Sequence, residues 1–365
     1  MSMTETLSVE IDFLPVGEGS RSGDAIAIRY GLYEEKRWKN QTIFIIDGGD
    51  SDSGDALVRH VQEVYKSNKV DRVILTHPDA DHASGLRKVI ENLDVGKIWM
   101  HRPWTYWSDL KDAIIDNRVT KKSFGERLRE AYQYAHDIEQ IAIRKDIKIF
   151  HPHQGSSFAI NGERILTILG PGKDLYLDLV RASDKTPHLE PLIKMSESVW
   201  GRKKVIANED MTFATEHLAD EHEATSAEND MSLVLLLTVG GRKFMFTGDA
   251  GTRGLFNAIS YASSQQISLK DLTIFDVPHH GSKHNLSKGI LNYINAEYAI
   301  ISCSKFGEPN HPSAIVTNSL LRRKINPYCT KGNLLTYYSG AVPARDNLVP
   351  VNPMQFSFQV EIPNE

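Results

Sequence analysis

Hydrophobic residues in the first eighty positions form short runs separated by glycine and polar residues. The runs at residues 7–16, 25–31 and 42–47 alternate with polar residues or are rich in β-branched ones, which predicts three strands. Apolar residues at helical spacing predict a helix over residues 53–68, and residues 70–77 form another strand-like run. The order of three strands, a helix and a strand indicates a mixed α/β fold.

The middle of the chain has a different pattern. Residues 104–145 combine charged residues with helical periodicity and predict two helices, and strand-like runs return at residues 147–152 and 164–171. The stretch from Ile206 to Ser232 carries eight acidic residues and no lysine or arginine. Because like charges repel one another and favour water, we expect this stretch to be a solvated, flexible loop.

The second half again places polar residues where strands end. Residues 232–249 predict a β-hairpin that turns at two glycines and ends in Asp249. The run at residues 272–282 predicts a strand that delivers His279 and His280, and Asp47 ends a strand in the first half. Residues of functional sites commonly lie where a rigid strand runs into a loop. We therefore expect a site between two packed sheets.

The densest chemical signal is the sequence Thr-His-Pro-Asp-Ala-Asp-His at residues 76–82. It places four potential metal ligands, His77, Asp79, Asp81 and His82, within six residues. Imidazole nitrogens and carboxylate oxygens suit zinc, manganese or iron, and a tight turn can aim all four at one point. Asp81 could instead cap the following helix, but a cap needs one aspartate, not two aspartates with two histidines.

The ligand candidates from both halves together suffice for two metal ions with one bridging carboxylate. Two ions in such sites lie roughly 3.5–4 Å apart, where they can hold a hydroxide and polarise the bond that it attacks. The sequence therefore favours metal-dependent hydrolysis.

Composition limits the setting in which this chemistry occurs. The 365 residues are 41% hydrophobic and 24% charged, which is ordinary for a folded domain. We find no signal-peptide pattern and no apolar run long enough to span a bilayer. Only Cys303 and Cys329 are present, so we expect no disulfide framework and no cysteine zinc cluster, and we predict a cytoplasmic protein. The net charge of −5 means that binding to nucleic acid would need a local basic patch.

In this order, the motifs resemble those of the metallo-β-lactamase superfamily, and within it the hydrolase domain of ComEC-type DNA-uptake proteins. The family's first metal motif is usually His-x-His-x-Asp-His, and here Asp79 replaces the second histidine, a variant typical of the ComEC-like branch. The resemblance covers roughly residues 7–100 and 225–325. The matching segments are 16–19 with 23–25, 45–49, 76–82, 229–235, 246–249, 277–282 and 307–313.

The resemblance implies one domain over residues 1–365, an α/β fold of the αββα sandwich type, with a largely helical insertion at about residues 101–225. It also implies two divalent ions, zinc or manganese. His77 and Asp79 would hold the first, Asp81 and His82 would hold the second, and Asp249 would bridge them.

The resemblance gives roles to further residues around the ions. His279 would complete the second metal site, and His280 is the alternative ligand or a group near the leaving oxygen. Asp47 would orient the ligand loop through hydrogen bonds. His311 would contact a substrate phosphate or donate a proton, although a plain loop histidine before a proline fits equally well.

Two features depart from the family's pattern. Ser20, Arg21 and Ser22 lengthen the loop after Val16, and the histidine of the third motif is missing. Glu228 or Asn229 lies near its place, with Asn229 expected beside the ligands. We therefore expect one of the two ions to be held weakly.

For the substrate, we favour the phosphodiester bonds of nucleic acid, with Asp81, His280 and His311 nearest the reaction, because ComEC-like hydrolase domains are associated with nuclease action. Basic runs at residues 202–204 and at residues 322–324 with Lys331 either contact phosphates or form solvated faces. One alternative is a hydrolase of a small phosphoester or nucleotide messenger, which fits an acidic chain with an insertion over its site. A non-catalytic regulatory protein on the same fold is another.

Four aromatic residues follow the first metal motif, namely Trp99, Trp104, Tyr106 and Trp107. Aromatic side chains can stack on bases, but at this density we expect them to anchor the insertion on the core. The pattern predicts no membrane partner and leaves the oligomeric state open.

Overall fold

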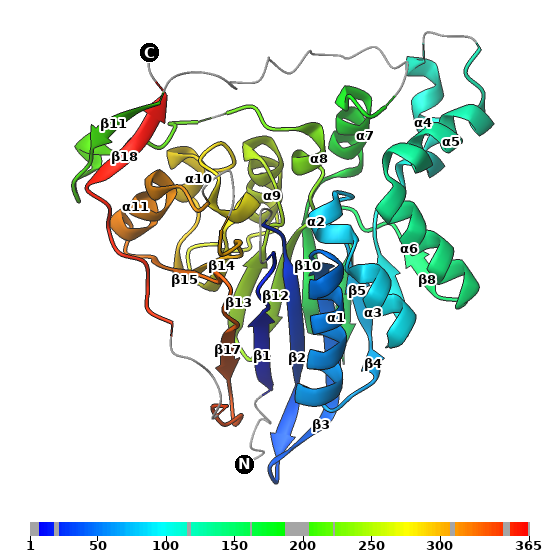
Figure 1. Ribbon diagram of the computed structural model, residues 1–365, viewed down its shortest axis with the longest axis horizontal. Helices are drawn as coiled ribbons and strands as arrows, with labels where there is room; N and C mark the ends of the chain where they lie inside the picture. The colour runs from blue at the N-terminus through cyan, green and yellow to red at the C-terminus, as the bar shows by residue number, and fades with distance from the viewer. Residues whose placement is uncertain are drawn as a thin grey trace.

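The fold is given by a computed structural model that describes residues 7–17, 22–114, 118–160, 163–186, 204–221, 223–306, 311–345 and 351–363. Two seven-stranded sheets lie face to face, and helices cover the outer side of each sheet (Figure 1). The predicted αββα sandwich is therefore confirmed. Residues 18–21, 202, 203 and 307–310, which include parts of the predicted motifs and basic runs, lie outside the described residues.

The first sheet combines strands from both ends of the chain. Its antiparallel half joins the C-terminal β17 to β1, β2 and β3, and its parallel half continues through β5, β7 and β8. The strands are β17 (Leu335–Ser339), β1 (Ser8–Phe13), β2 (Ala25–Glu34), β3 (Arg37–Gly48), β5 (Arg72–Ile74), β7 (Lys97–Trp99) and β8 (Lys148–Phe150).

The second sheet repeats this division. Strands β9, β10, β12 and β13 are antiparallel, and β13 to β16 are parallel. The strands are β9 (Ser157–Ile160), β10 (Glu163–Gly170), β12 (Val234–Val239), β13 (Arg242–Phe246), β14 (Leu272–Asp276), β15 (Ala296–Ile301) and β16 (Asn326–Cys329). Two small sheets pair β4 (Lys69–Val70) with β6 (Asp94–Val95) and β11 (Lys204–Asn208) with β18 (Gln359–Pro363).

Helices form the two outer layers. On the first sheet lie α1 (Ser51–Arg59), which continues as a π-helical turn (His60–Val64), α3 (Leu86–Asn92), α5 (Lys121–Ala131), α6 (Gln133–Arg144) and α7 (Lys173–Ala182). On the second lie α9 (Thr252–Ser264), α10 (Lys288–Leu291) and α11 (Ala314–Arg322). Short helices are α2 (Ala80–Ala83), α4 (Trp107–Leu110) and α8 (Ala227–Asp230), with 3-10 turns at Pro103–Thr105, Lys111–Ala113, Phe213–Thr215 and Pro278–Gly281.

An apolar layer between the sheets holds the two halves of the chain together. Strand residues that alternate inward from both sheets make up this layer, as in the contact of Phe13 with Phe246, whose ring centroids lie 6.3 Å apart. Full burial of each such side chain stabilises the fold by about 1.5–3 kcal/mol. Strand ends that are far apart in sequence are thereby fixed against one another.

The acidic stretch at residues 206–232 is only in part the solvated loop that we predicted. Residues 210–214 are exposed, but the side chains of Glu209 and Arg322 are buried and lie 3.0 Å apart, and Glu216 pairs with Arg323. The prediction missed these pairs because the compensating arginines lie more than a hundred residues further along the chain. The same pairs withdraw Arg322 and Arg323 from the phosphate-contact role considered above.

The segment predicted as an insertion, about residues 101–225, contributes to both sheets. It supplies β8 to the first sheet and β9 with β10 to the second, so it is part of the sandwich as well as a helical cover. The aromatic cluster belongs to the core, because Trp99, Trp104 and Tyr106 are each less than 10% exposed. The expectation that these side chains are core residues is confirmed.

The two cysteines form a disulfide, Cys303–Cys329, at the ends of the neighbouring parallel strands β15 and β16. The predicted absence of a disulfide was therefore wrong, and the cysteine argument for a cytoplasmic location no longer holds. In the part of the chain that the structure describes, no helix is both long and apolar enough to cross a membrane.

Candidate metal centre

The polar strand ends of both sheets meet at one place. Asp47 ends β3, His77 follows β5, Asp249 follows β13, and His280 follows β14. β3 pairs in parallel with β5, and β13 pairs in parallel with β14, and ligands of α/β proteins commonly bind at the carboxyl ends of parallel strands. The fold therefore places the residues of the two halves side by side.

Two glycines allow the loops around this place to touch through their backbones. A Cβ atom on Gly23 would lie 2.3 Å from the carbonyl oxygen of Asp81, and one on Gly85 would lie 1.9 Å from that of Gly48. Any side chain at either position would force the loops apart. The contact at Gly23 brings the neighbouring Asp24 to the ligand turn.

Hydrogen bonds fix the orientation of three histidine rings. His82 Nδ1 lies 2.8 Å from Asp47 Oδ2. His77 Nδ1 lies 3.1 Å from the hydroxyl of Thr76, which itself donates to Asp47 Oδ2 at 2.6 Å. Because Asp47 can only accept, both Nδ1 atoms are assigned the hydrogen, which leaves Nε2 as the free nitrogen.

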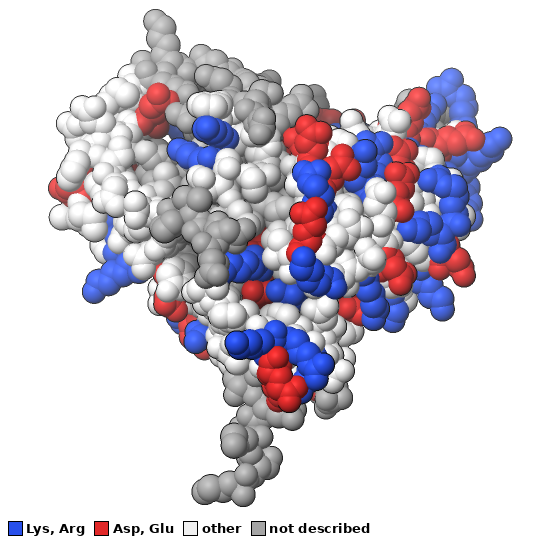
Figure 2. Space-filling model, turned by 60° about the horizontal axis from the view of Figure 1, so that its bottom comes forward, with Lys and Arg blue, Asp and Glu red and all other residues white. Residues whose placement is uncertain are grey.

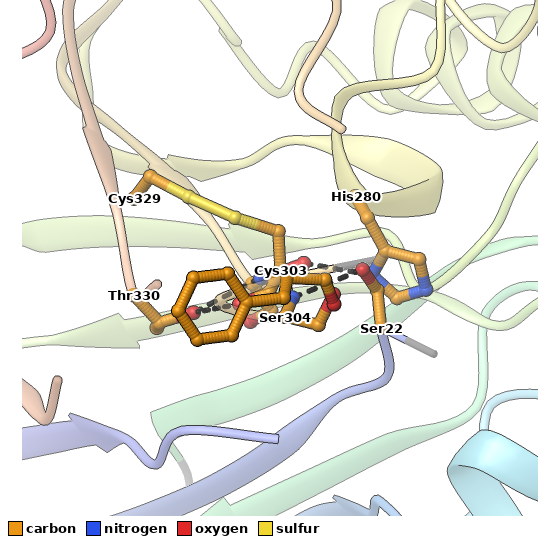
Figure 3. Close-up of a disulfide and its surroundings, with 8 residues drawn as sticks. Ser22, His280, Cys303, Ser304, Cys329 and Thr330 are labelled. Atoms are coloured by element: carbon orange, nitrogen blue, oxygen red, sulfur yellow. Dashed lines mark hydrogen bonds between the residues drawn. A yellow bond between two sulfur atoms is a disulfide. The ribbon is translucent and has the colours of Figure 1, made fainter. Parts of the chain in front are cut away.

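On the second sheet, the ring of His280 is also oriented by a hydrogen bond at Nδ1. Its Nδ1 donates to the carbonyl of Ser302 at 2.8 Å, beside the Cys303–Cys329 disulfide (Figure 3). The segment is held further by the Ser304 amide, which donates to Ser22 at 3.0 Å. The Nε2 atom of His280 is therefore also free.

The three free nitrogens converge on Asp249. His77 Nε2 lies 3.6 Å from Asp249 Oδ2, and His82 Nε2 and His280 Nε2 lie 3.3 Å and 3.6 Å from Asp249 Oδ1. All four side chains are buried, and the three Nε2 atoms and Asp249 Oδ1 have no hydrogen-bond partner. Buried polar atoms are otherwise nearly always paired. Three imidazoles and a carboxylate facing one another form a donor set that fits a divalent cation.

Asp24 and Asp81 add carboxylates to this donor set. Among the described residues, donors form four groups of three, and the ligand atoms within each group all lie within 4.8 Å of one another. They are His77, His82 and Asp249; Asp81, His82 and His280; Asp24, Asp249 and His280; and Asp24, Asp47 and His82. The donors can therefore serve more than one ion position, with Asp249 shared between two groups.

The electrostatics of the site favour a cation. Burial raises the pKa of Asp249, but His82, His279 and His280 outweigh burial and hold that pKa well below its usual range. Burial lowers the pKa of His82, yet Asp249 and Asp47 raise it well above the ordinary value. A metal ion that binds His82 Nε2 would take the place of this proton, so its affinity should rise with pH.

His279 and His280 adopt an uncommon backbone conformation. Their φ angles are +48° and +57°, in the left-handed region that non-glycine residues rarely occupy. The turn leaves His279 on the outer side, with Nε2 3.8 Å from Asp249 and Nδ1 between Asn285 at 2.8 Å and Asn229 at 3.1 Å. The structure thus brings His280, rather than His279, into the groups of clustered donors.

His311 lies behind these two rings. Its ring centroid is 5.9 Å from that of His279, and its Nδ1 atom is buried without a partner. Burial, with the nearby His280 and His279, lowers the pKa of His311 to about 3. A neutral imidazole at this place favours a hydrogen-bonding role over donation of a proton at neutral pH.

Two predicted ligand positions lie apart from the clustered donors. Asp79 accepts from Lys185 at 2.7 Å and belongs to none of the four donor groups. Glu228, considered as a substitute for the missing third-motif histidine, accepts instead from Ser183 at 2.5 Å and Tyr132 at 3.2 Å. The side of the site next to Asp79 is therefore poorer in metal donors than the side next to Asp81.

A family model places this arrangement among known proteins. The model described as the metallo-beta-lactamase superfamily matches residues 37–305, a span that contains the clustered donors other than Asp24. The chain belongs to the metallo-beta-lactamase superfamily.

Individual superfamily relatives match shorter segments. ComE operon protein 3 of Bacillus subtilis is 27% identical over 132 residues, which are 36% of this chain and 16% of that protein. Recombination protein 2 of Haemophilus influenzae is 30% identical over 110 residues, 29% of this chain and 13% of that protein. The matches thus span less than a fifth of each relative. A solved metallo-beta-lactamase from Novosphingobium pentaromativorans shares 10% identity, with a TM-score of 0.31 over 78% of this chain and 83% of the other.

Three residues of the candidate site escaped the sequence analysis. Asp24 stands in a quoted motif, but no role was assigned to it. Thr76 carries the hydrogen-bond relay between Asp47 and His77 and could have been suspected from its place before the histidine. Lys185 gave no signal, because it lies in a loop 106 residues from its partner Asp79.

Proposed function

We propose that this chain is a metal-dependent phosphodiesterase that cleaves nucleic acid. The observation that carries the metal-dependent part is the convergence of three buried, unpaired imidazole nitrogens on Asp249 from two sheets. Holding these atoms together without a cation would leave each of them desolvated and unpaired, at about 1–3 kcal/mol for each group.

The ligands would bind up to two divalent ions, zinc or manganese. Divalent ions supply an activated water and polarise a phosphoryl oxygen when bound. His77, His82, His280 and Asp249 would hold them, with Asp81 and Asp24 on the side of His82 and His280 and Asp79 on the side of His77. Asp47 and the Ser302 carbonyl keep the rings aimed at this place.

The nucleic-acid part of the proposal is supported by similarity to two relatives. One relative is named for the ComE operon and the other for recombination, at 27% and 30% identity over the segments that match. A nuclease of this type would contact the substrate through phosphates at the mouth of the site.

A second candidate is hydrolysis of a small phosphoester or nucleotide messenger. Arg322 and Arg323 form internal ion pairs, so that Lys324 and Lys331 alone remain exposed from the basic run that follows His311. In Figure 2, cationic and anionic side chains are interspersed over the right-hand part of the molecule. Between α3 and α6, for example, Arg87 pairs with Asp137 and Arg144 with Glu91. Mixed charge of this kind offers no continuous basic surface to a long polyanion on the face shown.

The test compares substrates and variants with added manganese or zinc. Turnover is measured on single-stranded DNA, duplex DNA, RNA and a small aryl phosphodiester, for the natural chain and for Asp81→Ala combined with His82→Ala. We expect the double variant to remain folded and to lose nearly all hydrolysis. The control is Asp220→Ala, which removes an exposed partner of Lys288 and should leave turnover unchanged.

The outcomes separate the two candidates. A nuclease should turn over polymers far better than the small diester, and its polymer KM should rise steeply with salt. A flat salt profile with preference for the small diester selects the second candidate. No metal-dependent turnover of any phosphodiester rejects the proposal.

A further inference from the structure

Lys185 brings a positive charge to the edge of the metal site. It follows α7, and its Nζ atom lies 2.7 Å from Asp79 Oδ1. The other oxygen of Asp79 lies 3.9 Å from His77 Nε2, so the ammonium and the imidazole share one carboxylate. The side chains of Lys185 and Asp79 are 41% and 29% exposed, which places the pair at the mouth of the site and open to solvent.

The segment that carries Lys185 is anchored at the place where the third-motif ligand is missing. Ser183 Oγ donates to Glu228 at 2.5 Å and accepts from the backbone amide of Lys185 at 3.0 Å. Tyr132 joins this hydrogen-bond network, because its hydroxyl donates to Glu228 at 3.2 Å. The Lys185 ammonium lies 5.4 Å from the centroid of the Tyr132 ring. The contacts that turn Glu228 away from the metal donors therefore also fix the base of Lys185.

The distribution of donors matches this arrangement. The clustered groups in the described residues contain His77, His82, Asp24, Asp47, Asp81, Asp249 and His280, but not Asp79. The Asp79 side therefore has one carboxylate that is already paired with a cation of the chain itself. A metal ion there would have to displace the ammonium.

We propose that Lys185 supplies the positive charge on the Asp79 side of the site, where it competes with a second metal ion for Asp79 and offers its ammonium to an anionic group of the substrate. The substrate part rests on the proposed phosphodiesterase function, but the metal part does not. The proposal predicts one tightly held ion near Asp81, His82 and His280, and a second, weaker one near Asp79.

The metal part is tested by titrating the metal-free protein with Mn²⁺ and counting bound ions per chain by equilibrium dialysis and elemental analysis. The natural chain should bind one ion tightly. Lys185→Met frees Asp79, so the second ion should bind about fivefold more tightly or better, the upper range for an exposed ion pair. Lys185→Arg keeps the competing charge and should resemble the natural chain.

A matched control comes from the helix that precedes Lys185. Lys173 at the start of α7 pairs with Asp109 at 2.8 Å, away from the clustered donors. Lys173→Met removes an ion pair of the same type and should leave both ion affinities unchanged. Two equally tight ions in the natural chain, with no change in Lys185→Met, would overturn the proposal.

The substrate part has its own measurement. For a phosphodiester that the natural chain cleaves, Lys185→Met should raise KM about tenfold, and Lys185→Arg should restore most of the loss; an unchanged KM refutes this part. If no phosphodiester is cleaved, the proposed function fails, while the Mn²⁺ titration still decides whether Lys185 competes for Asp79.

Discussion

Asp47→Asn is the sharpest test of how the site is aligned. Asp47 is fully buried and accepts three hydrogen bonds, from the Thr76 amide at 2.8 Å, the Thr76 hydroxyl at 2.6 Å and His82 Nδ1 at 2.8 Å. Its φ of +55° is a conformation that asparagine tolerates as well as aspartate, so the substitution changes the chemistry without straining the backbone. Alanine at this place would confuse the two effects.

An asparagine cannot accept from all three partners as Asp47 does. If its amide oxygen faces the Thr76 amide, its NH₂ group faces the Thr76 hydroxyl and His82 Nδ1. His82 must then accept through Nδ1 and carry its hydrogen on Nε2, the atom that faces Asp249. If the amide is turned over, NH₂ opposes the Thr76 N–H, and a buried donor stays unpaired at about 1–3 kcal/mol.

In either orientation of the asparagine, we expect the affinity for a metal ion to fall more than the stability of the fold. We expect metal affinity to fall about 10–100-fold, the range for loss of a group that orients a ligand. The free energy of unfolding without metal should fall by only about 1–3 kcal/mol. The two quantities are measured by equilibrium dialysis with Mn²⁺ or Zn²⁺ and by urea unfolding in chelator.

The control is Asp50→Asn. Asp50 caps α1 by accepting from the Ser53 amide at 2.8 Å, and asparagine caps helices equally well. This variant should bind metal like the natural chain. If Asp47→Asn also binds metal with unchanged affinity, the assignment of the His82 and His77 rings is refuted.

Three further predictions concern regions around the site. Burial lowers the pKa of His101 well below its ordinary value and that of His151 to about 4, so the unfolded chain binds more protons than the folded chain between pH 6.5 and 4. The stability of the fold should therefore be full above pH 6.5 and fall as the pH drops. Thermal melts of His151→Gln should show a smaller loss of stability over this range. Arg322→Met should cost about 3–5 kcal/mol in urea unfolding by stranding Glu209, whereas a phosphate-binding arginine would lose affinity with little change in stability. A peptide map without reductant should recover Cys303 and Cys329 in one linked fragment, and finding both as free thiols would contradict the disulfide.

Local patterns in the sequence sufficed for the sandwich and for most donors of the site. The strands that carry Asp47, His77, Asp249 and His280 have apolar runs that end in polar residues, so their ends could be found without tertiary information. The order of the sheets could not be found in this way, because β17 and β1 pair across more than three hundred residues.

The errors share a physical cause, which is pairing between distant segments. The acidic stretch looked solvated in the sequence because the arginines that pair with its glutamates, Arg322 and Arg323, lie far along the chain. Choosing between His279 and His280 required the left-handed turn, which no local pattern in the sequence reveals. The two cysteines are 26 residues apart, and only the adjacency of β15 and β16 brings them together.

The division of the donors between two sheets has a consequence for synthesis. A ribosome delivers His77, Asp81 and His82 long before Asp249 and His280, and the carbonyl that aims His280 belongs to Ser302, later still. A nascent chain that ends before Asp249 therefore has only the donors of the first sheet. The complete set of donors should therefore come together only after most of the polypeptide has been made and the second sheet has docked on the first.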